Sequence, residues 1–112
     1  MTAVTFRTEG ARLTGFSCRG HSGFAQAGED IVCAAVTSAV RLTETVINEV
    51  LGLAATVRVR EEEAFLSLRL PGGLSPETEE TCQALLAGLM VYLAQLHEEY
   101  PAFVEVREEE AS

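Results

Sequence analysis

Two long segments with helical spacing of apolar residues constrain the fold of this chain more than any other feature. In residues 31–51, apolar side chains recur at the spacing of one helix face, and Gly52 follows as a stop signal. In residues 76–100, Ser75 followed by proline marks a helix start, and Pro101 ends the helix. Each helix buries one face, so each needs a sheet or another helix to cover it.

Short segments of alternating apolar and polar residues surround the two helices and predict β-hairpins. One hairpin is expected over residues 2–8 and 11–18, and a second over residues 54–60 and 64–70. A last strand is expected over residues 102–107. The element order is therefore ββαββαβ, an α+β fold with a mostly antiparallel sheet and two helices packed on one face.

The length of 112 residues predicts one domain over residues 1–112, with an acidic tail that frays over residues 108–112. The second helix carries a further face of small or apolar residues beside its core stripe. This face predicts contact with a second subunit, and its members are Ala84, Ala87, Gly88, Val91 and Ala94.

The charge and cysteine content limit the partners and the compartment. The formal net charge is −9, from eight Arg, no Lys and seventeen acids, which disfavours nucleic acid and favours a basic partner. Three cysteines in a chain with no secretory signal predict reduced thiols in the cytoplasm. No apolar run reaches the roughly 18 residues that a membrane helix needs, so no membrane contact is expected.

The segment around Cys33 is the strongest indication of chemistry. With Asp30 as N-cap, Cys33 falls in the first helical turn, where free N–H groups stabilise a thiolate and can bind an oxyanion. His21 lies in a glycine-rich loop over residues 19–29 and can take and return the thiol proton. Asp30 is either the cap or a partner that orients His21. Thr37 lies one turn after Cys33, where its hydroxyl bonds either the thiolate, a substrate carbonyl or the helix backbone.

Other interpretations of the same residues stay open. Cys33 can be a small buried hydrophobe in a non-catalytic binding module. Cys18 and His21 resemble half a zinc site, although no spacing to the remaining cysteines matches a standard zinc finger. Cys18 can also form a redox pair with Cys33. Cys82 lies on an apolar helix stripe and is expected in the core, whereas His97 is expected at the surface.

Gly20-His21, followed after eleven residues by the Cys33 of Asp30-Ile31-Val32-Cys33-Ala34-Ala35-Val36, resembles the ribosomal-processing cysteine proteases, often called Prp. The resemblance spans nearly the whole chain. It includes the segment Glu98-Glu99-Tyr100-Pro101 that leads into the last strand.

The resemblance implies a small homodimeric enzyme that removes a short N-terminal extension from large-subunit ribosomal protein number twenty-seven, without metal or cofactor. It implies that Cys33 is the nucleophile, that His21 is the general base and acid, and that Asp30 and Gly20 support the site. Thr37 stands where family members usually carry Ser, so the hydroxyl is kept and a methyl is added. The loop that covers the substrate would include Ser22, Gly23, Phe24 and Gly28.

Overall fold

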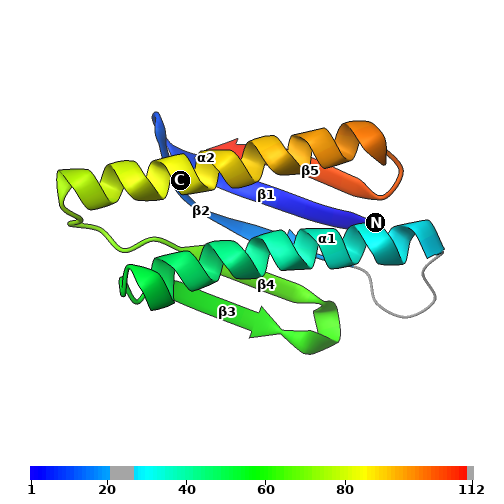
Figure 1. The fold of residues 1–112 in the computed structure, drawn as a ribbon, viewed down its shortest axis with the longest axis horizontal. Helices are drawn as coiled ribbons and strands as arrows, with labels where there is room; N and C mark the ends of the chain where they lie inside the picture. Colours follow the sequence, from blue (N-terminus) through cyan, green and yellow to red (C-terminus); the bar gives the residue numbers. More distant parts are fainter. Residues whose placement is uncertain (21–26, 111–112) are drawn as a thin grey trace.

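The computed structural model describes residues 1–20 and 27–110, with residues 27–30 described as backbone only. The elements follow the predicted order (Figure 1). They are β1 (Thr2–Glu9), β2 (Arg12–Arg19), α1 (Ala27–Glu44), the π-helical η1 (Thr45–Val50), β3 (Thr56–Arg60), the 3₁₀ turn η2 (Glu61–Glu63), β4 (Phe65–Arg69), α2 (Pro76–Glu99) and β5 (Val104–Glu110).

The five strands form one sheet in the order β3-β4-β2-β1-β5. Three of the neighbouring pairs are antiparallel, and β5 pairs in parallel with β1 because α2 carries the chain back across the sheet. Helices α1 and α2 lie side by side on one face of this sheet (Figure 1). The predicted α+β class and the two-helix layer are therefore confirmed.

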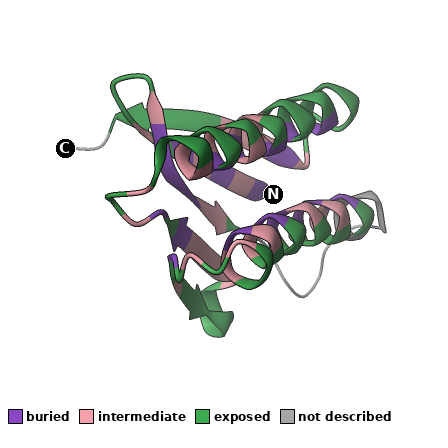
Figure 2. Cartoon of the chain, turned by 60° about the vertical axis from the view of Figure 1, so that its left-hand side comes forward, coloured by how far each residue is buried: buried purple, intermediate pink, exposed green. Residues whose placement is uncertain are grey.

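The core lies between the sheet and the helix layer, where the buried parts of both layers face each other (Figure 2). Val4 and Phe6 of β1 meet Val36 of α1 and Leu86 of α2 in one apolar cluster. Gly15 of β2 matters for the pairing of β2 with β4, because a side chain there would overlap the carbonyl of Leu68 on β4. The glycine that interrupts the alternating pattern thus allows the two strands to pair.

One segment differs from the expectation about membrane helices. Ile31–Val50 is long and apolar enough, by length and composition alone, to cross a membrane. Its Val32, Val36 and Val40 are buried against the sheet, which is the pattern of a helix in a layered core.

The first helix begins earlier than predicted. α1 starts at Ala27, so Asp30 is a helical residue and not the N-cap, and Gly28 lies in the first turn and not in a loop. Alanine is the best helix former, and acids such as Glu29 are favoured in the first turn, which explains the earlier start. The predicted start of α2 is confirmed, since Ser75 accepts a hydrogen bond from the N–H of Thr78 and caps the helix.

The acidic end of the chain is ordered through residue 110, so the prediction that it frays from Glu108 is wrong for residues 108–110. Glu110 accepts hydrogen bonds from the Thr8 hydroxyl (3.2 Å) and the Gly10 N–H (3.1 Å). Arg7 also pairs with Glu109 at 3.7 Å. These contacts fasten β5 to the β1–β2 hairpin.

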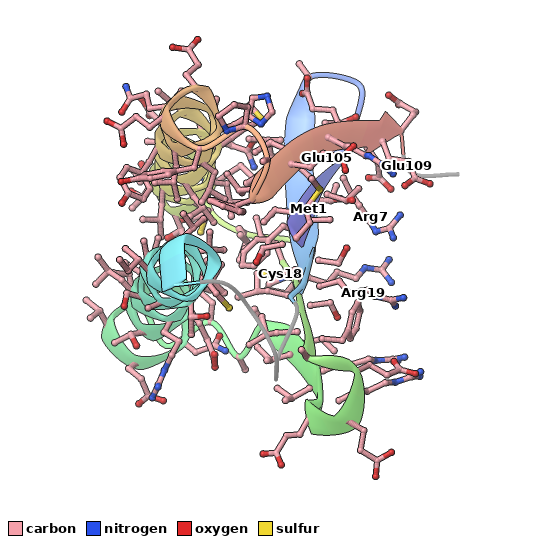
Figure 3. All side chains as sticks on the ribbon, turned by 90° about the vertical axis from the view of Figure 1, so that its right-hand side faces the viewer. Met1, Arg7, Cys18, Arg19, Glu105 and Glu109 are labelled. Carbon is pink, nitrogen blue, oxygen red and sulfur yellow. The ribbon has the colours of Figure 1, made fainter. Side chains whose placement is uncertain are left out.

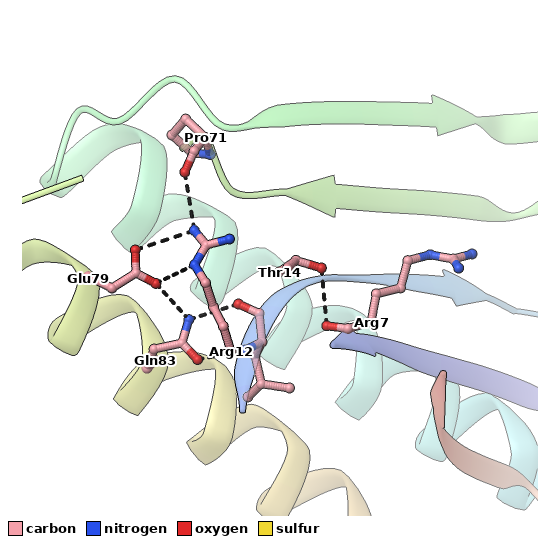
Figure 4. A network of polar contacts seen from close by, with 7 residues as sticks. Arg7, Arg12, Thr14, Pro71, Glu79 and Gln83 are labelled. Carbon is pink, nitrogen blue, oxygen red and sulfur yellow. Dashed lines mark hydrogen bonds and ion pairs between the residues drawn. The ribbon is translucent and has the colours of Figure 1, made fainter. Parts of the chain in front are cut away.

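A polar network near the N-terminal end of α2 holds this helix against the β1–β2 hairpin (Figure 4). Arg12 donates to Glu79 at 2.6 Å and to the carbonyl of Pro71 at 3.3 Å. Gln83 exchanges two hydrogen bonds with the backbone of Leu13. The hydrogen bond from Arg12 to Glu79 raises the pKa of the guanidinium.

Candidate active site

Cys33 lies on α1 above the end of the sheet where β2 leads into Gly20. A β-carbon built on Gly20 would lie 3.7 Å from the Cys33 sulfur, 3.8 Å from the Ala64 carbonyl oxygen and 3.9 Å from the Thr2 hydroxyl. The Gly20 N–H donates to Ala64 at 2.8 Å, which fixes this backbone position. Because Gly20 has no side chain, the described residues leave a methyl-sized space beside the half-buried sulfur.

Thr2 contributes a polar group to this space that the sequence pattern did not single out. Thr2 is only 1% exposed, and its hydroxyl has no hydrogen-bond partner among the residues that the structure describes. Thr2 shares the apolar face of β1 with Val4 and Phe6, and a hydroxyl in such a stripe is the signal that could have identified it. A buried hydroxyl without a partner costs about 1–3 kcal/mol.

Cys18 is the other thiol near the site. It lies on β2 two residues before Gly20 and, like Gly20, points toward the helix layer (Figure 3). Burial, together with the charge of the neighbouring Cys33, raises the pKa of the Cys18 thiol to about 11. Cys18 therefore stays protonated at neutral pH and is a poor nucleophile there.

The remaining predicted site residues divide into those that the structure describes and those that it does not. His21, Ser22, Gly23 and Phe24 lie outside the described residues, as does the side chain of Asp30. Thr37 is exposed one turn after Cys33 on the same side of α1.

The earlier start of α1 also changes the electrostatics expected around the thiol. Cys33 is the seventh residue of the helix, and the unpaired N–H groups belong to the first four. The effect of the helix dipole falls off within the first turn. The expectation that first-turn N–H groups stabilise the thiolate and an oxyanion at Cys33 is therefore wrong.

The structure describes the environments of Cys82 and His97, two residues of the alternative interpretations. Cys82 is buried in the core as predicted, and His97 is exposed and bonds the Val104 carbonyl through Nδ1 at 2.6 Å. Within residues 1–20 and 27–110, no three Cys, His, Asp or Glu side chains gather where they could hold a metal ion.

Comparison with known proteins matches this chain to one family along most of its length. The model of the family described as cysteine protease Prp matches residues 1–105. The ribosomal processing cysteine protease Prp of Bacillus subtilis is 28% identical over 98 residues, which are 88% of each chain.

Solved structures share the fold. SMU.848 from Streptococcus mutans superposes with a TM-score of 0.85 at 22% identity, covering 99% of this chain and 96% of that one. The ribosomal processing protease Prp from S. aureus, solved with a substrate peptide, gives a TM-score of 0.79 at 18% identity over 97% of this chain and 100% of its own. Since the family model covers residues 1–105, this chain belongs to the cysteine protease Prp family and is a cysteine peptidase.

Proposed function

We propose that this protein is an endopeptidase that removes a short N-terminal extension from large-subunit ribosomal protein number twenty-seven, with Cys33 and His21 as a catalytic dyad. The observation that carries the proposal is the contact between the Cys33 sulfur and the Gly20 position. Consecutive Cα atoms lie about 3.8 Å apart, so chain connectivity keeps His21 next to this position. The relatives from B. subtilis and S. aureus, which are named as ribosomal processing proteases, support the substrate class.

The reaction follows from the two side chains. His21 takes the proton from the Cys33 thiol, and the sulfur attacks the carbonyl carbon of the scissile peptide bond. His21 then gives the proton to the leaving amine as the carbon–nitrogen bond breaks, which leaves a thioester on Cys33. Water, deprotonated by His21, hydrolyses the thioester and restores the thiol.

Charge beside the site favours a basic substrate. The exposed η2 turn Glu61–Glu63 directly precedes Ala64, whose carbonyl lines the space beside Cys33. Arg60 pairs with Glu63 at 3.7 Å, so Glu61 and Glu62 are the carboxylates available to a basic peptide. The basic N-terminal region of a ribosomal protein fits this charge, and we infer that the reaction takes place in the cytoplasm, where thiols stay reduced.

The decisive experiment uses a peptide that spans the extension and the first residues of the mature ribosomal protein from the same organism. Wild-type protein should cut it at one bond, as measured by mass spectrometry. Cys33→Ala and His21→Gln should each abolish cleavage and keep the wild-type circular dichroism spectrum. Cys18→Ala and His97→Gln are matched controls and should keep activity. Cleavage by Cys33→Ala at the wild-type rate would contradict the proposed nucleophile.

We also infer that the protein is a homodimer joined through the outer face of the helix layer. A groove of about 550 Å³ runs between α1 and α2, and its lining includes Ala39, Leu42, Ala84, Leu85, Gly88 and Tyr92. Leu42, which lines this groove, is 63% exposed, so the groove presents apolar surface that a second subunit can cover. The predicted small-residue face of α2 supplies Ala84 and Gly88 to this groove.

Gly88→Glu tests the dimer, because nothing lies within 4 Å of a β-carbon at Gly88 and the single subunit should tolerate the change. The variant should elute as a monomer with light scattering detection, while the wild-type protein elutes at twice that mass. Thr56→Glu places the same charge on the open face of the sheet, away from the helix layer, and should remain dimeric. A wild-type monomer at micromolar concentration would contradict the inference.

A further inference from the structure

Six of the eight arginines of this acidic chain lie on one surface, the open face of the sheet. Residues paired across neighbouring strands point to the same side, so the strand register identifies the members of this face. One row is Arg60, Phe65, Arg19, Ala3 and Glu105, the next is Arg58, Ser67, Ser17, Thr5 and Arg107, and the third is Thr56, Arg69, Gly15, Arg7 and Glu109.

This arginine face points away from the helix layer. The side chains of Arg7, Arg19, Glu105 and Glu109 extend from the side of the sheet opposite to α1 and α2 (Figure 3). All six arginines of the face are exposed to solvent. The face is therefore separate both from the Cys33 site and from the groove between the helices.

The arginines of the face are neutralised unequally. Arg7 pairs with Glu109, Arg107 with Glu105, and Arg60 with Glu63 at the hairpin end. Among residues 1–20 and 27–110, no carboxylate pairs with the other three, which are Arg19, Arg58 and Arg69. Positive charge without an ion-pair partner thus lies along β2, β4 and β3, while the exposed carboxylates of Glu61 and Glu62 lie at the hairpin end of β3 and β4, next to Arg60.

The groups between these arginines suit a nucleic acid strand. Phe65 lies beneath Arg19, whose guanidinium carbon is 5.3 Å from the ring centroid. Ser17 and Ser67 are partly exposed neighbours that can donate hydrogen bonds to phosphate oxygens. Arginine, serine and an aromatic ring on an open sheet are the groups with which proteins bind the backbone and bases of single-stranded RNA.

The net charge of −9 does not prevent such binding, because charges are screened over about 8 Å at physiological salt. The acids of α2 and of the helix layer lie on the other side of the sheet, and the two shorter extents of the molecule are 26 and 25 Å. A phosphate on the open face therefore responds mainly to the local arginines. We propose that the open face of the sheet binds single-stranded RNA through Arg19, Arg58 and Arg69.

Fluorescence anisotropy with a labelled oligouridylate of about 20 nucleotides tests the proposal on the full-length protein. Three phosphate contacts predict that affinity falls by about tenfold to thirtyfold between about 50 and about 200 mM salt. At about 100 mM salt, Arg58→Gln should weaken binding by about fivefold, and the triple change of Arg19, Arg58 and Arg69 to Gln by about a hundredfold. Peptide cleavage should be unchanged in both variants, because these arginine side chains lie on the side of the sheet opposite to Cys33.

Arg41→Gln is the matched control, since it removes the same charge from an exposed position on α1. Equal weakening by Arg41→Gln and Arg58→Gln would overturn the proposal, because it would show that only net charge matters. If the triple variant unfolds, this single-variant comparison still decides. Tighter binding to anionic phospholipid vesicles or to a polyglutamate peptide than to the RNA would also overturn it, in favour of a membrane or an acidic protein.

Discussion

The sulfur of Cys33 lies 3.7 Å from the point that a β-carbon would occupy on Gly20. This contact joins the end of β2 to the second turn of α1, two segments that the sequence separates by twelve residues. Because His21 follows Gly20 directly in the sequence, this proximity is the basis of the proposed Cys33–His21 dyad.

Gly20→Ala should fold normally and lose activity. The three nearest atoms to the added methyl would lie at 3.7–3.9 Å, which are ordinary contact distances, so we expect a melting temperature within a few degrees of wild type. The methyl occupies the space beside the sulfur, so kcat/KM should fall at least about tenfold. Gly72→Ala, where nothing lies within 4 Å of the β-carbon, is the control and should change neither quantity. Full activity of Gly20→Ala would show that substrate approaches the sulfur from another side.

Thr2→Val should make the protein more stable and less active. Valine keeps the shape of threonine and removes a buried hydroxyl that has no partner among the described residues, so the free energy of unfolding should rise by about 1 kcal/mol. The same hydroxyl borders the space beside Cys33 and can bond a substrate there, so kcat/KM should fall severalfold. Urea unfolding and peptide cleavage measure the two effects. Thr5→Val, on the open side of β1, is the control. Gained stability with unchanged kcat/KM would mean that Thr2 only packs.

The pKa of Cys18 predicts a loss of stability at alkaline pH. Burial and the nearby Cys33 raise this pKa from 9.0 to about 11, so the folded protein keeps a proton that the unfolded chain releases. The stabilising effect is complete below about pH 9 and is lost as pH rises through about 11, a loss of about 3 kcal/mol. Urea unfolding between these pH values should show a steeper decline for wild type than for Cys18→Ala. Parallel curves for the two proteins would contradict the shifted pKa.

Neutralising the acidic turn beside the site should weaken substrate binding. We expect the double change Glu61→Gln and Glu62→Gln to raise KM for the basic peptide severalfold and to leave kcat unchanged, because these exposed carboxylates attract the substrate without touching the sulfur. The effect should shrink as salt is added. Glu49→Gln is the control, because Glu49 is exposed and lies in η1, at the opposite end of the molecule from the η2 turn (Figure 1). A fall in kcat with constant KM would instead assign the turn a part in the chemical step.

Local pattern predicted much of this structure. The helical stripe of residues 76–100 with its Ser75 cap, the two hairpins and the order ββαββαβ could be read from the sequence because periodicity and capping act over a few residues. The start of α1 could not, since Asp30 is as good a cap as a first-turn residue and only the whole fold selects Ala27 as the first helical residue. The order of the acidic C-terminal residues could not be predicted either, because it depends on contacts between distant segments. The Thr8 hydroxyl and the Gly10 N–H that bind Glu110 are about a hundred residues away in the sequence.

The sequence alone indicated which side chains are candidates for catalysis and which segments are helices or strands. Both depend on the type of each residue and on its spacing from near neighbours in the chain. Only the tertiary structure decided what those residues face. The tertiary structure brings Thr2 and Gly20 beside Cys33. It also brings onto one face arginines from five different strands, a cluster that the negative net charge of the chain does not reveal. Strand register and helix docking produce these neighbours, and both arise from packing between segments far apart in the chain.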